Sequence, residues 1–289
     1  MALQLQDVSR RWRRVTLTVA MAAGTVALSG CSASLTEQAK RIGMVPPASS
    51  RAPYMERLWQ GAWIAAGVVG VIVWGLMFYA AIKWRRKKGD PEVPRQTKYH
   101  LPLELLYTLI PLMIVGVLFF YTVRTQDKVL AKDPVPQHTI HVLGEKWSWA
   151  FSYMEADNPK VGAVVHTVGS LQQRPDLYLP LGESVRFNIT SADVDHSFWI
   201  PAFYFKLDAI PGHPNSFDLT PTRLGTYDGK CAELCGTYHS QMLFTVHVVT
   251  PAQYYQQLQQ LKAAGQTGDY QGLLAPSTIQ TANAQGAGK

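Results

Sequence analysis

Residues 231–242 contain four side chains that bind soft or borderline metal ions. They are Cys231, Cys235, His239 and Met242. A fifth candidate ligand, His196, lies upstream in the run Asp-Val-Asp-His-Ser-Phe-Trp. Thiolate, imidazole and thioether groups together favour copper, whereas carboxylate-rich sites favour harder ions. A blue-copper site has a single cysteine ligand. Cys231 and Cys235 together could bridge two metal ions.

Three other interpretations of these residues remain open at this point. If the protein is exported, Cys231 and Cys235 could form a disulfide, as cysteine pairs of exported proteins commonly do. A disulfide would leave the histidines and the methionine unexplained. A structural zinc site could use both cysteines with His196 and His239, and it would not need Met242. A lone methionine is also ordinary filler of a hydrophobic core. Four further histidines fit no ligand signature and are expected to be ordinary strand or loop residues: His138, His141, His213 and His247.

The residues around this cluster predict an all-β domain over residues 132–250. Short β-branched or aromatic runs at 139–143, 184–189 and 244–249 alternate with Gly and Pro, which is typical of a sandwich or barrel. A short helix is predicted at 252–264, within a C-terminal region of 251–289. The rest of that region is rich in Ala, Gly, Gln and Thr, and we expect it to be disordered.

Two uncharged segments precede the β domain. Residues 58–82 and 105–123 contain no charged side chain, and each run is long enough to cross the hydrocarbon core of a bilayer. The sequence therefore predicts transmembrane helices at 58–83 and 103–124. The intervening loop, 84–102, is basic and is expected in the cytoplasm. Both ends of the hairpin, and the β domain, then lie outside.

The N-terminus has the pattern of a bacterial export signal over residues 1–30. Four arginines precede a short apolar run, which ends in Leu28-Ser29-Gly30-Cys31. This box resembles a lipoprotein cleavage site, in which Cys31 becomes the lipidated N-terminus of an exported segment, 31–57. An uncleaved anchor with an incidental cysteine is the alternative. The expected location is the bacterial inner membrane, with a multi-pass chain.

The charge distribution argues against a nucleic-acid partner. The chain carries a net charge of +7, but its basic residues lie beside the apolar runs. Residues 132–250 hold eight basic and twelve acidic residues, a net charge of −4. A nucleic-acid-binding domain would show the opposite sign.

The complete pattern resembles subunit II of the haem-copper terminal oxidases, in its lipoprotein form with a dinuclear CuA centre. The matching signature is Cys231-x-Glu-x-Cys-Gly-x-x-His-x-x-Met242, preceded by Asp193-x-x-His196-Ser-Phe-Trp and Asp208-Ala-Ile-Pro-Gly212. The resemblance covers roughly residues 55–250. It implies an α+β membrane protein, in which a two-helix transmembrane hairpin precedes an all-β cupredoxin-like sandwich.

The resemblance also implies a role for each residue of the site. Cys231 and Cys235 would bridge two coppers, and His196 and His239 would each bind one. Met242 would be the weak axial ligand of one copper. The backbone carbonyl of Glu233 would serve the other copper, while its side chain would bind a magnesium ion shared with subunit I.

As the resemblance implies, such a subunit accepts electrons from a cytochrome c, or from a cytochrome bc complex with a c-type haem subunit. It passes them to subunit I, which holds haem and CuB and reduces oxygen to water with proton translocation. Partners would be subunit I and other oxidase subunits. A quinol oxidase subunit II and a copper-binding lipoprotein are the alternative functions.

Two residues outside the ligand set inherit roles from the resemblance. Trp147 would accept the electron from the cytochrome, although Trp147 and Trp149 could both be core residues. Glu104 would lie at the entrance of a proton channel of subunit I, although a glutamate there could simply cap a helix. Asp195, immediately before His196, departs from the family, which usually has an apolar residue there.

Overall fold

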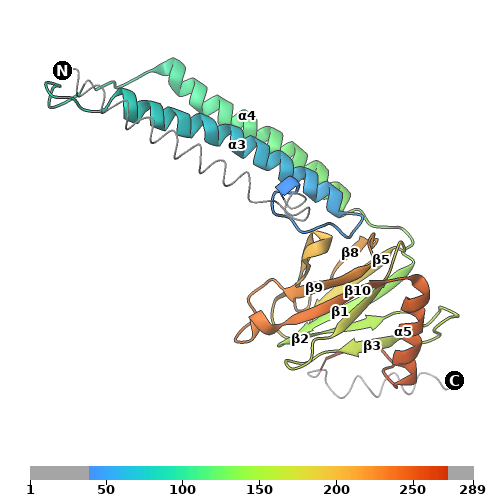
Figure 1. The fold of residues 1–289 in the computed structure, drawn as a ribbon. Coiled ribbons are helices and arrows are strands. Elements are labelled where there is room, and N and C mark those ends of the chain that lie inside the picture. Colours follow the sequence, from blue (N-terminus) through green and yellow to red (C-terminus); the bar gives the residue numbers. More distant parts are fainter. Residues whose placement is uncertain (1–38, 95, 273–289) are drawn as a thin grey trace, which may run out of the picture. The chain divides into compact units, whose positions relative to one another are not determined.

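The computed structural model describes residues 39–94 and 96–272. Cys31 and the proposed cleavage box therefore lie outside the described residues. The chain divides into two compact units, residues 1–45 and 46–289, and the elements below belong to the second. Two long helices come first, then the strands, and then a C-terminal helix, an order that the colours of Figure 1 follow.

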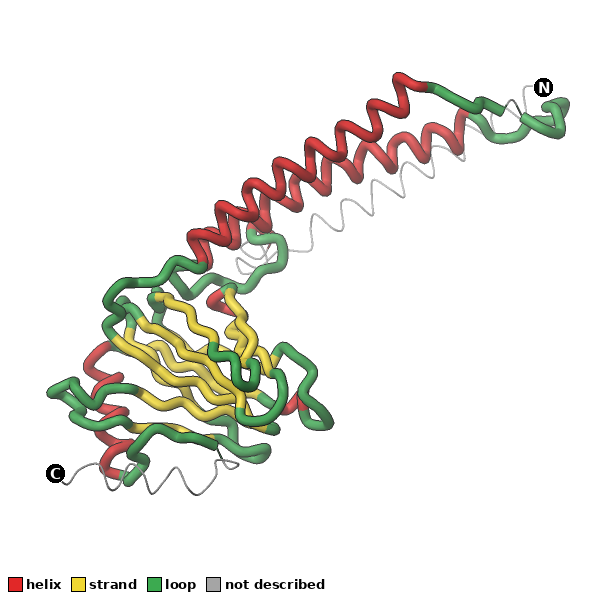
Figure 2. The backbone as a smooth tube through the Cα atoms, turned by 180° about the vertical axis from the view of Figure 1, so that it is seen from behind, coloured by secondary structure: helices red, strands yellow, loops and turns green. Residues whose placement is uncertain are grey.

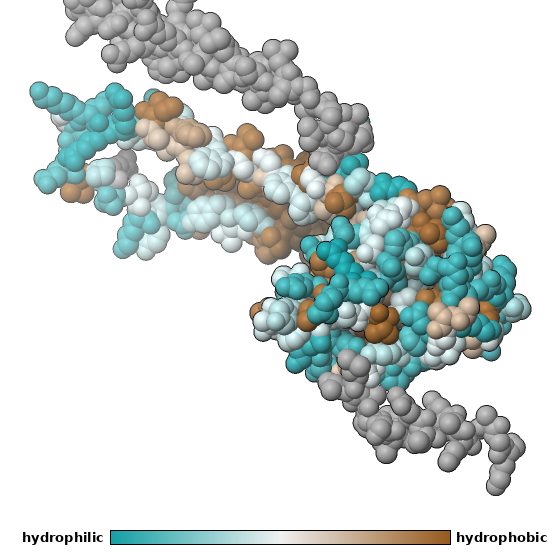
Figure 3. Space-filling view, turned by 60° about the horizontal axis from the view of Figure 1, so that its bottom comes forward, coloured by the Kyte–Doolittle hydropathy of each residue, from teal (hydrophilic) through white to brown (hydrophobic). Residues whose placement is uncertain are grey.

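The two long helices are α3 (Ala52–Lys83) and α4 (Leu101–Val129). Each helix is long and apolar enough to cross a membrane, and the most apolar stretch of each helix has no buried residue. Hydrophobic surface accordingly gathers along both helices in Figure 3. The helices extend past the predicted spans at the start of α3 and the end of α4. There Arg51 donates to the backbone oxygens of Lys128 (2.8 Å) and Ala131 (2.5 Å), which ties the two helix ends together.

Among the described residues, ten strands form two five-stranded sheets. Figures 1 and 2 show how the strands gather in this domain. The first sheet has the order β3-β2-β1-β5-β8 and the second β4-β10-β9-β6-β7. The strands are β1 (His138–Glu145), β2 (Ser148–Tyr153), β3 (Val165–Val168), β4 (Asp176–Pro180), β5 (Val185–Ser191), β6 (His196–Ile200), β7 (Phe205–Ala209), β8 (Asn215–Leu219), β9 (Gly225–Cys231) and β10 (Leu243–Val249). The predicted fold class, two apolar helices followed by a β sandwich, is confirmed.

Alternating side chains fill the space between the sheets. Every second residue of β10 and of most of β1 and β5 is buried, which is the period of a strand with one face on a core. Aromatic rings dominate this core: Phe198 and Phe244 stack at 4.9 Å, and Trp149 meets both edge-on. Gly229 is required beside them, because a Cβ there would lie 2.0 Å from the Phe244 ring.

Helix α5 (Pro251–Ala263) begins with a capping box, in which Thr250 and Gln253 satisfy each other's backbone N–H groups. It buries Tyr254, Leu258 and Leu261, as their helical spacing predicts. The expectation of disorder directly after this helix is wrong for residues 265–272. These residues make hydrogen bonds to β1, β2 and β3 that composition alone does not reveal.

Part of the segment before α3 also packs on the β domain. Ala48 donates its backbone N–H to Ala202 (2.8 Å), and its carbonyl accepts from Thr222 (2.9 Å). Ser49 forms a β-bridge with Pro221. Residues 46–51 thus tie the start of α3 to the sandwich, a role that was not predicted.

His138, expected to be an ordinary strand residue, is buried between two carboxylates. Its Nδ1 lies 2.6 Å from Oε1 of Glu155, and its Nε2 lies 2.6 Å from Oε2 of Glu183. Burial acts to lower the pKa of His138, but the two carboxylates outweigh it and raise the pKa above 6.5. Because the carboxylates lie on opposite ring nitrogens, the trio is a hydrogen-bonded chain and not a metal site.

We expect His138→Gln to destabilise the β domain by about 3 kcal/mol below pH 6, because it breaks a buried ion pair. Because the pKa of His138 is raised in the folded protein, the stabilisation by this ion pair is fully present below pH 6.5. It is lost as the pH rises through the folded-state pKa of His138. The other titratable groups near the ring are Tyr254, Tyr255 and, over the Tyr255 ring, Lys160. Urea denaturation of wild type and variant across a pH series measures the difference. A difference that grows with pH would contradict this sign.

Candidate metal centre

Three neighbouring strands bring the predicted ligands to one end of the second sheet. His196 begins β6, Cys231 ends β9, and Met242 immediately precedes β10. In the sheet β9 lies between β6 and β10, and Phe198 pairs with Cys231. The 231–242 loop is held to this frame by hydrogen bonds from Ala232 to the Ser197 carbonyl and from Cys231 to the Met242 carbonyl.

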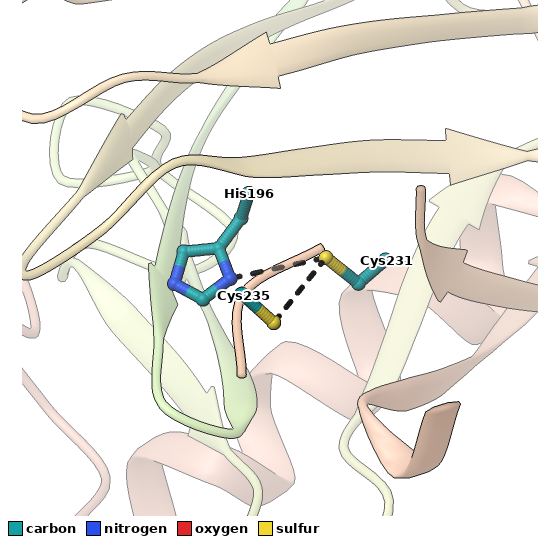
Figure 4. Close-up of side chains that lie close together, drawn as sticks. All are labelled: His196, Cys231 and Cys235. Carbon is teal, nitrogen blue, oxygen red and sulfur yellow. Dashed lines mark hydrogen bonds between the residues drawn. The ribbon is translucent and has the colours of Figure 1, made fainter. Parts of the chain in front are cut away.

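The side chains of these residues converge. Sγ of Cys231 and Sγ of Cys235 lie 3.9 Å apart, and Nδ1 of His196 lies 3.8 Å from the Cys231 sulfur, as Figure 4 shows. On the other side, Cys235 lies 3.6 Å from Nδ1 of His239 and 3.8 Å from Sδ of Met242. The carbonyl oxygen of Glu233 lies 3.2 Å from the Cys231 sulfur. The other four predicted ligand groups therefore surround the pair of sulfurs.

The imidazole of His196 is held with Nδ1 towards the sulfurs. Its Nε2 lies 2.8 Å from Oδ1 of Asp193, a carboxylate that can only accept from it. Gly144 makes room for the ring, because a Cβ there would lie 3.0 Å from Cδ2 of His196. An outer carboxylate that fixes the ring and tautomer of a histidine is typical of metal sites. Asp193 was predicted only as part of the motif, and its position three residues before His196 is the signal for this contact.

The pKa values of the two thiols are shifted in opposite directions. Burial acts to raise the pKa of the Cys231 thiol, but His196 and backbone groups at Ser197 and Glu233 outweigh it and lower the pKa to about 7. Burial, together with the adjacent Cys231, raises the pKa of Cys235. The protein alone thus favours one thiolate, and a cation between the sulfurs would stabilise the second.

This geometry decides among the alternatives for the cysteines. A disulfide needs sulfurs about 2.05 Å apart, and in the described chain Cys231 and Cys235 are both free and buried. Met242 is fully buried, and its sulfur lies 3.8 Å from that of Cys235, a position that suits a ligand. Two thiolates, two imidazoles, a thioether and a carbonyl are a donor set that fits copper better than zinc.

The indole of Trp147 lies against the ligand loop, whereas the ring of Trp149 meets the imidazole of His196 edge-on at 6.0 Å. The indole N–H of Trp147 donates to the carbonyl of Cys235 (3.3 Å), and its ring meets Tyr238 edge-on at 4.9 Å. Gly236 permits this approach, because a Cβ there would lie 3.2 Å from Nε1 of Trp147. Trp149 is fully buried in the core. The two residues do not share a strand face, because β2 begins only at Ser148.

The remaining predicted residues lie apart from the sulfurs. The side chains of Glu233 and Asp195 are exposed. Glu104 lies in the first turn of α4, and its Oε1 accepts from the backbone N–H of His100 (3.0 Å), which is a capping contact. His213, in the loop before β8, is exposed.

A basic groove beside the ligands was not predicted. It has a volume of about 530 Å³ and opens next to Cys231 and His239. Lys206, Lys230 and Trp199 line it, and the ammonium of Lys230 lies 4.4 Å from the centre of the Trp199 ring. The groove is positively charged, whereas Asp193 and Asp195 are negatively charged.

Comparisons with known proteins agree with this arrangement. The family described as "Cytochrome C oxidase subunit II, periplasmic domain" matches residues 138–249. A probable cytochrome c oxidase subunit 2 of Streptomyces avermitilis is 43% identical, covering 90% of this chain and 91% of that protein. The cytochrome c oxidase subunit 2 of Mycobacterium tuberculosis is 36% identical, covering 87% and 83%. The crystal structure of the periplasmic domain of subunit II from Bradyrhizobium japonicum is 28% identical, covers 45% of this chain and 97% of that one, and has a TM-score of 0.40.

The apolar helices, the β sandwich and the buried sulfur–imidazole cluster define a membrane protein with a site suited to copper. The chain belongs to the cytochrome c oxidase subunit II family. It is thus a subunit of a haem-copper oxidase, as the sequence pattern predicts.

Proposed function

We propose that this chain accepts electrons from a cytochrome c at a dinuclear copper centre and passes them to the haem of subunit I, where oxygen is reduced to water with proton translocation. The observation that carries the proposal is the convergence of four further donor groups on two thiol sulfurs 3.9 Å apart. The donor, in this proposal, is a separate cytochrome c or the c-type haem subunit of a cytochrome bc complex.

Cys231 and Cys235 would bridge the two coppers, with His196 and His239 as terminal ligands. Met242 and the carbonyl of Glu233 would supply the weak ligands. When bound, the pair would supply a one-electron redox couple. The chain's own task is to hold these donors still: His196 by Asp193, and the loop by the backbone bonds to β6 and β10. A rigid donor set needs little rearrangement when its charge changes, which favours rapid transfer.

The surface around the centre suits two different partners. Trp147 is half-buried and touches the Cys235 carbonyl, so an electron reaching the indole is one hydrogen bond away from a ligand loop. The exposed Asp195 nearby would attract a basic cytochrome. The basic groove beside His239 suits an acidic surface of subunit I.

Two further roles rest on the family pattern. The exposed carboxylate of Glu233 would bind magnesium together with subunit I, since oxygen ligands suit that ion. Glu104 would lie at the entrance of a proton channel of subunit I, in addition to capping α4. Both are oxidase roles that the isolated chain would not perform.

We further propose that the mature chain begins at a lipidated Cys31, with the β domain on the outer side of the bacterial inner membrane. The basic residues between α3 and α4 support this orientation. Mass spectrometry of the native subunit should find its N-terminal peptide starting at Cys31 with attached lipid. An unmodified peptide spanning Gly30 and Cys31 as the main species would refute this.

The oxidase purified with this chain provides the test of the proposed function. It should oxidise reduced cytochrome c and consume oxygen without added quinol. Oxidation of quinol in the absence of any cytochrome would favour a quinol oxidase. A chain that purifies with copper but without subunit I would favour a copper-binding lipoprotein.

A further inference from the structure

Residues 265–272 form a strap across the first sheet, which we call the C-terminal strap. It begins at the edge strand β3, where the Gln266 carbonyl accepts from His166 (3.0 Å) and Gly268 donates to the Val164 carbonyl (2.8 Å). Thr267 pairs with Val165 in a β-bridge. The strap thus adds one isolated bridge to the edge of the sheet at β3.

From β3 the strap crosses β2 and β1. The backbone N–H of Tyr270 donates to Oγ of Ser152 on β2 (3.0 Å), and Oδ2 of Asp269 lies 3.1 Å from Nδ1 of His141 on β1. The strap ends beside the last residue of β1, since a Cβ at Gly272 would lie 3.2 Å from Oε2 of Glu145. Gly272 has φ +91°, a conformation that favours glycine.

The contact that matters here is between Tyr270 and Glu145. The Tyr270 hydroxyl donates to Oε1 of Glu145 at 3.0 Å. Glu145 is buried, so its carboxylate depends on hydrogen-bond donors from the protein. Burial and the neighbouring Glu145 raise the pKa of Tyr270 to about 12, so the hydroxyl remains a donor at physiological pH.

Glu145 opens the turn that carries Trp147, and each residue of this turn is held by a different part of the chain. The backbone N–H of Lys146 donates to Oδ2 of Asp193 (2.8 Å), the same carboxylate that orients His196. Trp147 donates to the Cys235 carbonyl. Glu145 is held by Tyr270 of the strap.

We propose that Tyr270 is a positioning residue for electron input: the C-terminal strap fixes the Glu145–Trp147 turn so that the indole keeps its contact with the ligand loop. This inference rests on the proposed role of Trp147. The C-terminal strap, which follows α5 and lies outside the two sheets of the sandwich, thereby has a function of its own. Tyr270 touches no metal ligand, so its effect must pass through the turn.

The test uses the full chain in the oxidase complex and a double-mutant cycle of Tyr270→Phe and Trp147→Leu. Tyr270→Phe should lower the rate of electron input at saturating cytochrome c about three- to tenfold, because small misplacements of a reacting group are costly. The KM for cytochrome and the absorption spectrum of the copper centre should not change. In the Trp147→Leu background, Tyr270→Phe should have no further effect, since residues that act through one another are not additive.

Tyr255→Phe is the matched control. It also removes a tyrosine hydroxyl that takes part in a hydrogen bond, because the Tyr255 hydroxyl accepts from the side chain of Asn158, and it lies away from Trp147. It should transfer electrons at the wild-type rate. A wild-type rate for Tyr270→Phe, an undiminished effect in the Trp147→Leu background, or equal slowing by Tyr255→Phe would overturn the positioning role while leaving the proposed function intact. A wild-type rate for Trp147→Leu would overturn both the role of Trp147 and this inference.

Discussion

Cys235→Ser is expected to abolish the paired copper site and the oxidation of cytochrome c by the complex. Cys235 is the central residue of the cluster, because its sulfur lies within 4 Å of Cys231, His239 and Met242. A serine hydroxyl is a poor bridge between soft metal ions. Changes to outer-shell partners cost roughly 10–100-fold in metal affinity or activity, so the loss of a bridging ligand should exceed that range. Copper content and cytochrome c oxidation by the purified complex measure the effect.

Met242→Leu is the matched control for this variant. It removes a soft donor from the same buried cluster while preserving side-chain volume, and it leaves both thiolates in place. We expect it to keep both coppers and to change their reduction potential, because an axial ligand tunes the potential of such a site. If Cys235→Ser retained two coppers, the thiolate bridge would be wrong.

Trp147→Leu is expected to slow electron input at least about tenfold, equal to about 1.4 kcal/mol in the activation barrier. The substitution removes the indole and its hydrogen bond to the Cys235 carbonyl, while all six ligand groups remain. Stopped-flow reduction by cytochrome c should therefore show normal binding and slow transfer. Transfer at the wild-type rate would make Trp147 an ordinary packing residue.

Asp195→Asn should have the opposite kinetic effect. Asp195 is exposed and its substitution removes one surface charge, whereas Asp193 also orients His196 and would be a poor probe of docking. The variant should lower the association rate and its dependence on salt, since attraction between surface charges is screened over about 10 Å at ~0.1 M salt. The rate within the complex should stay unchanged. An association rate that is independent of salt in the wild type would indicate a permanently bound donor.

The fold class and the clustering of the candidate ligands could be predicted because the signature is local and the patterns are periodic. Four candidate ligands fall within one twelve-residue stretch. The long uncharged runs and the alternation of apolar and polar residues in the strands can be read from the sequence alone. The contacts between distant segments that orient the candidate site could not be predicted. The contact of Trp147 with Cys235 joins residues 88 apart, and that of Tyr270 with Glu145 joins residues 125 apart. Only the packing of the two sheets brings such residues together.

Composition misled in the C-terminal region and for His138. Residues 265–272 are polar and glycine-rich, yet they gain order by adding to the edge of β3. His138 carries no motif, and its importance comes from Glu155 and Glu183, which lie on other segments of the chain. Tertiary contacts, an edge bridge in the first case and side-chain hydrogen bonds to loop carboxylates in the second, override the local signal.

The central claim is that this chain holds two coppers between Cys231 and Cys235 and that they accept the electron from cytochrome c. Electron paramagnetic resonance of the oxidase, combined with copper analysis of wild type and Cys235→Ser, tests it most directly. We expect wild type to contain two more coppers per complex than the variant, with hyperfine splitting from two equivalent copper nuclei that disappears on reduction by cytochrome c. A difference of one copper or none, zinc in place of copper, or a signal that cytochrome c does not reduce would contradict the claim.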